Sequence, residues 1–326
     1  MIQYTIFGES HGPAIGVVVT GLPHGLTVDL EAVEREMARR APGRDRISTA
    51  RKEADAVEIL SGLFEGKTTG TPLCGMIRNG DTRSRDYDKL KDMPRPGHAD
   101  YTGAMRYGGC NDHRGGGHFS GRLTAPLVFA GALAKQLLAR QGITVESRIS
   151  MLGGHADPTD EEVEAIILAA KSEGDSVGGA VSCVIRGVSA GFGSPDLGEN
   201  AEGILAKHLF AVPGVKGIEF GAGFDFAAMR GSEANDPFCI TDGKVGTSTN
   251  HAGGINGGIT NGMPLVFRVA MRPTPSISKP QQTVSLSAGR EETLVIEGRH
   301  DPCIVKRALP VIEAAAALAV CELMKV

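Results

Sequence analysis

The chain has 326 residues and a formal net charge of −4, with 34 lysines and arginines against 38 aspartates and glutamates. An apolar fraction of 41% is that of a globular protein and excludes disorder, and 45 glycines without a period of three exclude a collagen-like fibre. A mildly acidic chain with 5% aromatic residues and no tryptophan lacks the positive charge and the stacking surfaces of a nucleic-acid-binding protein.

Hydrophobic periodicity predicts short strands and amphipathic helices in the first half of the chain. Asp29 is the expected N-cap of the first helix, which Pro42 and Gly43 end. Residues 79–117 form a long irregular segment rich in Arg, Asp, Gly and Pro, and such segments in compact domains are usually functional. The expected strands are 3–7, 14–20, 57–60, 73–78 and 143–149, and the expected helices are 27–40 and 122–140.

The second half repeats the alternation of strands, glycine-rich loops and helices. Thr159 and Glu162 form a capping box for a helix that runs to residue 171, and Pro310 must kink or restart the last helix, 304–324. A further helix is expected at 202–212, with strands at 180–188, 215–220, 265–271 and 293–297. Because no linker rich in Pro, Ser or charge separates the halves, we expect one α+β domain over residues 1–326.

The cysteines and the N-terminal segment bear on the cellular compartment. The six cysteines are far apart and include no C-x-x-C pair, so the sequence predicts neither a zinc site nor a disulfide framework. The first 20 residues carry no signal-peptide pattern, and no uncharged apolar run is long enough to span a bilayer. We therefore expect a cytoplasmic protein without a membrane partner.

Two short motifs resemble known sites but stand in the wrong context. Residues 8–12 match the G-x-S-x-G turn of serine hydrolases, which must lead from a strand into a helix, whereas Pro13 and a valine run follow here. Residues 62–68 are one residue short of a phosphate-binding loop, and Pro72 prevents the helix that such a loop requires. A serine hydrolase is therefore a distant alternative, and an ATP site is not expected.

Arginines and two histidines are the best candidates for chemistry. The guanidinium fork binds phosphate through two hydrogen bonds, so arginine clusters in an acidic chain indicate a small ligand with more than one phosphate. A solvated helix end is the alternative for the first cluster. His11 and His98 each lie in a glycine or proline turn, where a modest environmental effect sets the proton near pH 7. The clusters comprise Arg35, Arg39, Arg40, Arg44, Arg46, Arg51 and Lys52, and then Arg78, Arg83, Arg85, Arg95, Arg106, Arg114 and Arg122.

Four separated motifs together resemble those of the chorismate synthase family. They are Gly8-Glu9-Ser10-His11-Gly12, Arg95-Pro96-Gly97-His98-Ala99-Asp100, Gly115-Gly116-Gly117 and Arg299-His300-Asp301-Pro302. The resemblance runs in order from residue 4 to about residue 320. It implies a β-α-β sandwich core with long active-site loops and a homotetramer. It also implies an enzyme of the shikimate pathway, a carbon–oxygen lyase acting on phosphates in aromatic amino acid biosynthesis.

The reaction implied by the resemblance is the 1,4-anti elimination of phosphate from 5-enolpyruvylshikimate-3-phosphate, which gives chorismate and requires reduced FMN. By the same resemblance Arg40 and Arg46 bind the substrate or NADP. His11 protonates the departing phosphate, His98 balances the charge of the reduced flavin, and Asp301 helps to keep the flavin N5 able to accept a proton. The residues implied to bind FMN are His118, Phe119, Ser120, Gly257, Arg272, Thr274, Ser276 and Arg299.

The chain departs from the family pattern after the triple glycine. The family commonly has Arg-Ser-Ser-Ala-Arg-Glu-Thr there, whereas residues 118–124 read His-Phe-Ser-Gly-Arg-Leu-Thr. The alternative to the enzyme is a phosphosugar- or nucleotide-binding module without the chemistry, and for Asp301 it is a helix N-cap. Reduction of the flavin by NADPH on the chain itself stays open; no reductase domain is visible, which favours an external flavin reductase.

Overall fold

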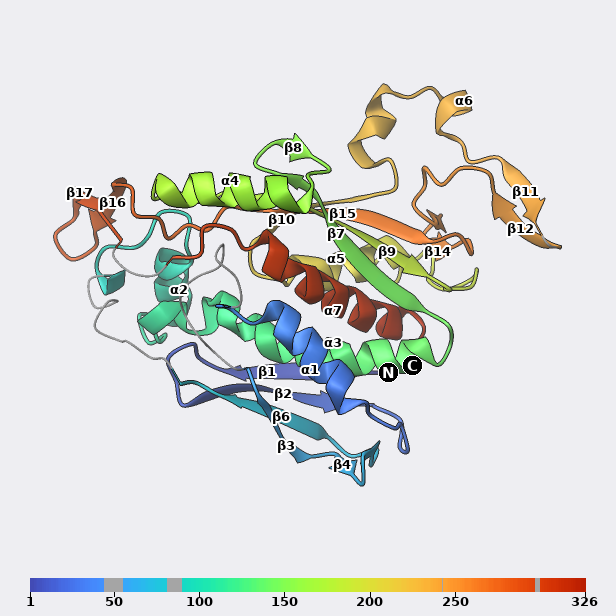
Figure 1. Ribbon diagram of the computed structural model, residues 1–326, viewed down its shortest axis with the longest axis horizontal. Coiled ribbons are helices and arrows are strands. Elements are labelled where there is room, and N and C mark those ends of the chain that lie inside the picture. The colour runs from blue at the N-terminus through green and yellow to red at the C-terminus, as the bar shows by residue number, and fades with distance from the viewer. Residues whose placement is uncertain (44–54, 81–89, 242, 297–299) are drawn as a thin grey trace.

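The computed structural model describes residues 1–43, 55–80, 90–241, 243–296 and 300–326, and two antiparallel sheets form its outer layers (Figure 1). The first sheet has the order β1-β2-β6-β3 and the second the order β10-β15-β9-β7-β8. The strands of the first sheet are β1 (Gln3–Gly8), β2 (Ala14–Thr20), β6 (Leu73–Arg78) and β3 (Val57–Ser61). Those of the second are β10 (Val215–Phe220), β15 (Leu265–Met271), β9 (Gly179–Arg186), β7 (Thr144–Leu152) and β8 (His155–Ala156).

Helices fill the space between the sheets (Figure 1). They are α1 (Leu30–Arg40), α3 (Thr124–Ala139), α5 (Ala201–Phe210) and α7 (Val305–Leu323). Most residues of the central pair, α3 and α7, are buried, as expected for helices packed between two layers. Gly131 of α3 allows the close approach, since a Cβ at this position would overlap Ala314 of α7. The β-α-β sandwich implied by the family resemblance is confirmed.

The remaining elements decorate this core. Helix α4 (Asp160–Ser172) has the predicted capping box, and α2 (Asp100–Tyr107) and α6 (Gly231–Ala234) are short. The hairpins are β4 (Leu63–Phe64) with β5 (Lys67–Thr68), β11 (Phe238–Thr241) with β12 (Lys244–Thr247), β13 (Ile255–Asn256) with β14 (Ile259–Thr260), and β16 (Gln281–Ser285) with β17 (Arg290–Leu294). Among the described residues no helix combines the length and hydropathy needed to cross a membrane.

Three sequence-based predictions of local structure differ from the structure in whole or in part. Helix α2 lies inside the segment 79–117 that was expected to be irregular, because its one glycine and two tyrosines leave little helical periodicity. Helix α7 runs through Pro310 as one helix, so the restart, one of the two expected outcomes, does not occur; the proline is the sixth helical residue and removes only one backbone hydrogen bond. The strand expected at 293–297 overlaps only the end of β17. Its partner β16 was not predicted, because its polar residues show no hydrophobic alternation.

A buried carboxylate joins the layers. Glu313 of α7 accepts hydrogen bonds from Arg39 of α1 at 2.6 and 2.7 Å and from Lys135 Nζ of α3 at 2.7 Å. The backbone N–H and hydroxyl of Ser147 in β7 donate to it at 3.2 and 2.8 Å. Burial alone would raise the pKa of Glu313, but the hydrogen bonds and charges of Arg39 and Lys135 lower it below the usual 4.5. Three helices and one sheet therefore meet at this side chain.

We predict that Glu313→Gln lowers the free energy of unfolding at pH 7 by about 2–3 kcal/mol, because Arg39 and Lys135 lose their buried counter-charge and keep only the ion pairs with Glu36 at 2.9 and 3.1 Å. The loss is below that of a fully buried pair, since the Arg39 side chain is 41% exposed. A carboxyl group whose pKa is depressed on folding stabilises the protein above its unfolded-state pKa and loses that effect as the pH falls. The difference between the wild type and Glu313→Gln should therefore shrink below about pH 4.5 in urea unfolding.

Glu146→Gln is the matched control, because Glu146 lies next to Ser147 on β7 and forms an exposed ion pair with Arg186. This variant should change the unfolding free energy by less than about 0.5 kcal/mol. Equal effects of the two substitutions, or a Glu313→Gln effect that does not vary with pH, would contradict the role given to Glu313.

Candidate active site

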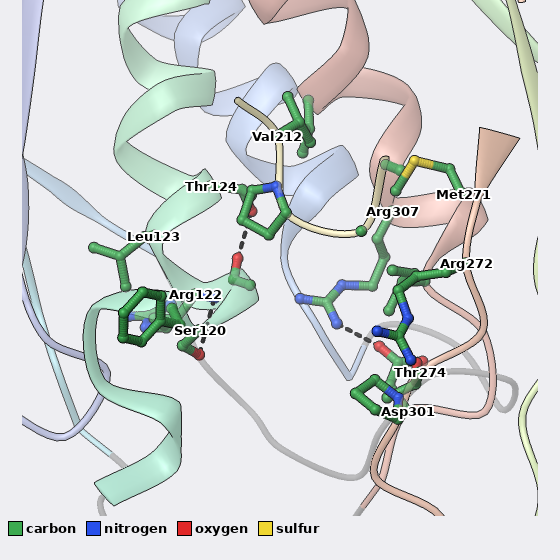
Figure 2. A pocket seen from close by; sticks show the side chains of 18 of the residues that line it. Ser120, Arg122, Leu123, Thr124, Val212, Met271, Arg272, Thr274, Asp301 and Arg307 are labelled. Carbon is green, nitrogen blue, oxygen red and sulfur yellow. Dashed lines mark hydrogen bonds and ion pairs between the residues drawn. The ribbon is translucent and has the colours of Figure 1, made fainter. Parts of the chain in front are cut away.

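A cavity of about 680 Å³ opens where α1 ends and where α3 and α7 begin (Figure 2). Its volume lies in the range of small-molecule sites. Asp301 is the only carboxylate among the described residues that line it, whereas six lining side chains are cationic. These are Arg40, Arg95, Arg122, Lys216, Arg272 and Arg307. Such a wall attracts a ligand that carries several negative charges.

Asp55 holds two of these arginines in place. Arg40 at the end of α1 and Arg122 ahead of α3 each donate to a different oxygen of its carboxylate. All three side chains are at most 4% exposed. Thr124 Oγ1 accepts from Arg40 Nε at 3.3 Å, and Asn79 Oδ1 accepts from Arg122 Nε at 3.2 Å. Because one negative charge faces two positive ones, the cluster keeps a net positive charge at the cavity wall.

The triple glycine brings the two predicted histidines close to one loop. Residues 115–117 all have positive φ, a conformation that side chains other than glycine rarely adopt. A Cβ at Gly115 would overlap the His11 imidazole, and a Cβ at Gly116 would lie 3.1 Å from His98 Cε1. The N–H of Ser10 donates to the Gly117 carbonyl at 3.1 Å, which ties the β1–β2 turn to the loop. His11 and His98 therefore pack against neighbouring glycines of one backbone turn.

Asp100 at the start of α2 organises the segment around His98. Arg95 donates to both carboxylate oxygens of Asp100 at 2.8 Å, and His98 Nδ1 lies 2.6 Å from Asp100 Oδ1. Arg95 NH1 also donates to Ser276 Oγ at 3.1 Å, across the cavity edge. Burial would raise the pKa of Asp100, but the hydrogen bonds from Arg95 and His98 hold it well below its ordinary value. Asp100 is therefore ionised at neutral pH.

Asp301 lies just ahead of α7, across the cavity from Ser120 and Arg122 (Figure 2). Its Oδ2 accepts from Arg307 NH1 at 2.5 Å, and Arg307 Nε donates to the Arg40 carbonyl at 2.9 Å. The helix begins only at Val305, after Ile304, and no side chain of the described residues caps it. The alternative of Asp301 as the helix N-cap is therefore wrong. Through Arg307, Asp301 is linked to the end of α1.

The other predicted site residues divide into three groups. Besides Arg40, His98 and Asp301, the cavity is lined by His118, Phe119, Ser120, Arg272, Thr274 and Ser276. Gly257 lies in the β13–β14 turn and is not among the lining residues. His11 does not line the cavity either, but its imidazole packs against Gly115, which does. Arg46 and Arg299 fall outside the described residues.

His118 and Thr274 bear on ligand binding in different ways. His118 stands where the family commonly has arginine, and its Nδ1 lies 2.9 Å from the Gly8 carbonyl, so the ring is fixed to the end of β1. Thr274 Oγ1 is buried without a hydrogen-bond partner among the described residues. A buried hydroxyl of this kind costs free energy unless something bonds to it, which makes Thr274 a ready contact for a ligand.

Sequence reasoning assigned no site role to Asp55, Asp100 or Arg307. Asp100 could have been predicted, because it stands two residues after His98 in a motif already identified as a candidate. Asp55 gave no signal, since it is one acid among several in a charged stretch and only its positive φ and burial distinguish it. The pairing of Arg307 with Asp301 depends on the helix start, which the sequence placed one residue early.

We predict that Asp55→Asn lowers the free energy of unfolding by at least about 3 kcal/mol, because two buried guanidinium groups lose their shared counter-charge. Asparagine has nearly the same shape and tolerates the φ of +50° at this position, so the change isolates the charge. Urea unfolding measures the effect, and Asp112→Asn, in the more exposed pair with Arg114, is the control. A loss below about 1 kcal/mol would mean that Asp55 does not hold the two arginines.

Comparison with known proteins places these features in one family. A family model described as chorismate synthase matches residues 2–324. The chorismate synthase of Thermococcus kodakarensis is 47% identical over 344 residues, covering 99% of this chain and 95% of the relative. That of Methanosarcina mazei is 48% identical over 340 residues, covering 98% and 93%. A crystal structure of a chorismate synthase superposes with a TM-score of 0.77 at 28% identity, covering 99% of this chain and 91% of the other.

Proposed function

The chain belongs to the chorismate synthase family, and from this premise we propose that its cationic cavity converts 5-enolpyruvylshikimate-3-phosphate to chorismate. In this 1,4-anti elimination the C–O bond to phosphate breaks, a proton leaves C6 and a second ring double bond forms. The enzyme is thus a carbon–oxygen lyase of the shikimate pathway. The observation that carries the proposal is the wall of six cationic side chains facing one carboxylate, because the substrate bears a phosphate and two carboxylates.

The residues present also fit a flavin mononucleotide. The orphan hydroxyl of Thr274 and the arginine side chains at the cavity edge supply donors for a second phosphorylated ligand. His118, Phe119 and Ser120 on one side, and Arg272, Thr274 and Ser276 on the other, would hold it, with Arg299 and Gly257 as further proposed contacts. Reduced FMN, when bound, supplies electron density for the breaking C–O bond and a base for the C6 proton.

Each proposed catalytic residue has a definite task in this arrangement. Arg40, with Arg46, binds and orients the anionic groups of the substrate. His11 gives its proton to the departing phosphate oxygen, a general-acid contribution of about 10²–10⁴ in rate. His98 offsets the negative charge of the reduced flavin, and Asp301 keeps a negative charge beside the group that accepts the C6 proton. The glycine loop 115–117 packs against both His11 and His98 and so fixes the distance between the two imidazoles.

Assembly and flavin supply are further parts of the proposal. The β11–β12 hairpin projects from the core and exposes Phe238, Ile240 and Val245 by 69–78%, and Phe224 is 84% exposed. Exposed apolar side chains of this kind support a subunit contact, as in the homotetramer that the family resemblance implies. We propose that an external flavin reductase supplies reduced FMN, with reduction by NADPH on this chain as the alternative. A cytoplasmic location stays a prediction.

The proposed activity requires a reduced flavin. Under anaerobic conditions, protein mixed with 5-enolpyruvylshikimate-3-phosphate and dithionite-reduced FMN should form chorismate and release one phosphate per turnover. No product should form with oxidised FMN or without flavin, because the electron density is then missing. Chorismate absorbance and phosphate release are followed together. Equal rates in the absence of flavin would refute the proposed function.

Asp301→Asn should lower turnover at least about tenfold, or roughly 1.4 kcal/mol of barrier, while leaving FMN affinity in a fluorescence titration nearly unchanged. Asparagine keeps the shape of the side chain but has no charge to place beside the reacting proton. Arg307→Gln tests the linkage to α1: it should cost less turnover than Asp301→Asn. If the two variants lose turnover equally, Asp301 acts only by holding Arg307.

Asp157→Asn is the control for this experiment, because Asp157 forms an exposed ion pair with Arg148 outside the cavity lining. Its turnover should match that of the wild type. Wild-type turnover in Asp301→Asn would remove Asp301 from the mechanism.

A further inference from the structure

The ring nitrogens of His98 are not equivalent. Nδ1 lies 2.6 Å from Asp100 Oδ1, and an ionised carboxylate only accepts hydrogen bonds. Nδ1 must therefore carry a hydrogen in this contact, whatever the charge of the ring. Nε2 is then the nitrogen that gains or loses a proton, and it belongs to a side chain that lines the cavity.

Asp100 is itself held rigidly. The backbone N–H of Arg95 donates to Oδ2 at 3.0 Å, the side-chain Nε donates to the same oxygen at 2.8 Å, and NH2 donates to Oδ1 at 2.8 Å. The side chains of Arg95 and Asp100 are only 6% and 7% exposed. Because the guanidinium also reaches Ser276, the carboxylate is fixed between α2 and the loop that follows β15.

The charges around His98 make Asp100 the group that balances them. Arg95 NH2 lies 3.0 Å from Nδ1 and 3.2 Å from Nε2, so a positive charge stands directly beside the imidazole. With a hydrogen on Nδ1, Nε2 is the ring nitrogen that can accept from this guanidinium. Arg272 reaches the same segment by donating to the Gly97 carbonyl. The glycine loop presents uncharged backbone at Gly116, and the loop after β15 presents the neutral Ser276. Among the described residues in contact with His98, Asp100 is thus the anion.

We propose that Asp100 is a positioning residue for His98: it holds the imidazole as the Nδ1–H tautomer, so that only Nε2 exchanges a proton in the cavity, and its charge offsets that of Arg95. This inference rests on the proposed function. The competing possibility is that Asp100 is only the ion-pair partner of Arg95 and does not affect the tautomer or the charge of His98. The two differ in the state of the His98 ring.

Nitrogen-15 NMR of the histidine side chains, in the resting full-length protein without ligands, tests the first half of the proposal. His98 is assigned by its disappearance in His98→Gln. Above its titration, wild-type His98 should be in the Nδ1–H tautomer, whereas Asp100→Asn should give a mixture with the more usual Nε2–H form. Wild-type His98 in the Nε2–H tautomer would overturn the proposal whether or not any variant folds.

Turnover with reduced FMN tests the second half. Asp100→Asn should lower kcat about tenfold with less than a threefold change in KM, and should shift the basic limb of the kcat–pH profile to lower pH. In a His98→Gln background the same substitution should add no further loss, because Asp100 acts through the ring. Matched thermal unfolding midpoints confirm that the variants are folded.

An additional loss of similar size in the His98→Gln background would assign Asp100 to Arg95 alone and overturn the proposal. So would an unchanged kcat and pH profile in Asp100→Asn. Failure of the proposed function is separate, since the wild type would then form no chorismate at all, whereas the tautomer measurement does not depend on turnover.

Discussion

Glu313 is the side chain on which the arrangement of layers depends, because it binds α1, α3, α7 and β7 at one buried carboxylate. Arg39, its partner on α1, directly precedes Arg40, which enters the cavity. The anchor that fixes the last turn of α1 therefore also fixes where the Arg40 guanidinium lies in the cavity wall. The cavity lies at the ends of the same three helices, so the core and the site share one framework.

The cationic side chains that line the cavity repel one another, and buried carboxylates offset this repulsion. Six cationic side chains line one cavity, and each pair brought together costs free energy unless a counter-charge intervenes. Asp55 forms ion pairs with Arg40 and Arg122, Asp100 with Arg95, and Asp301 with Arg307. These carboxylates position the cations without cancelling all of their charge, and the remainder favours an anionic substrate. Preorganised charge of this kind needs no rearrangement when the ligand arrives.

The sequence predicted the layers better than the contacts within the site. Strands β2, β6, β10 and β15 have the expected bounds, because period-two or continuous apolar patterns report burial directly. The motifs also brought His98, Asp301 and most of the proposed flavin contacts to one cavity. Asp55 escaped prediction, since its role arises from partners far along the chain, and β16 escaped because its polar residues show no hydrophobic pattern. No periodicity encodes a carboxylate that meets arginines 15 and 67 residues away.

A crystal structure of the protein with 5-enolpyruvylshikimate-3-phosphate and FMN tests the central claim, that this cavity is where the elimination occurs. The account predicts the substrate phosphate between Arg40 and His11, with the flavin ring between His98 and Asp301 and a hydrogen bond to Thr274 Oγ1. A flavin or substrate bound away from the helix ends, with the cationic wall holding only solvent, would contradict it.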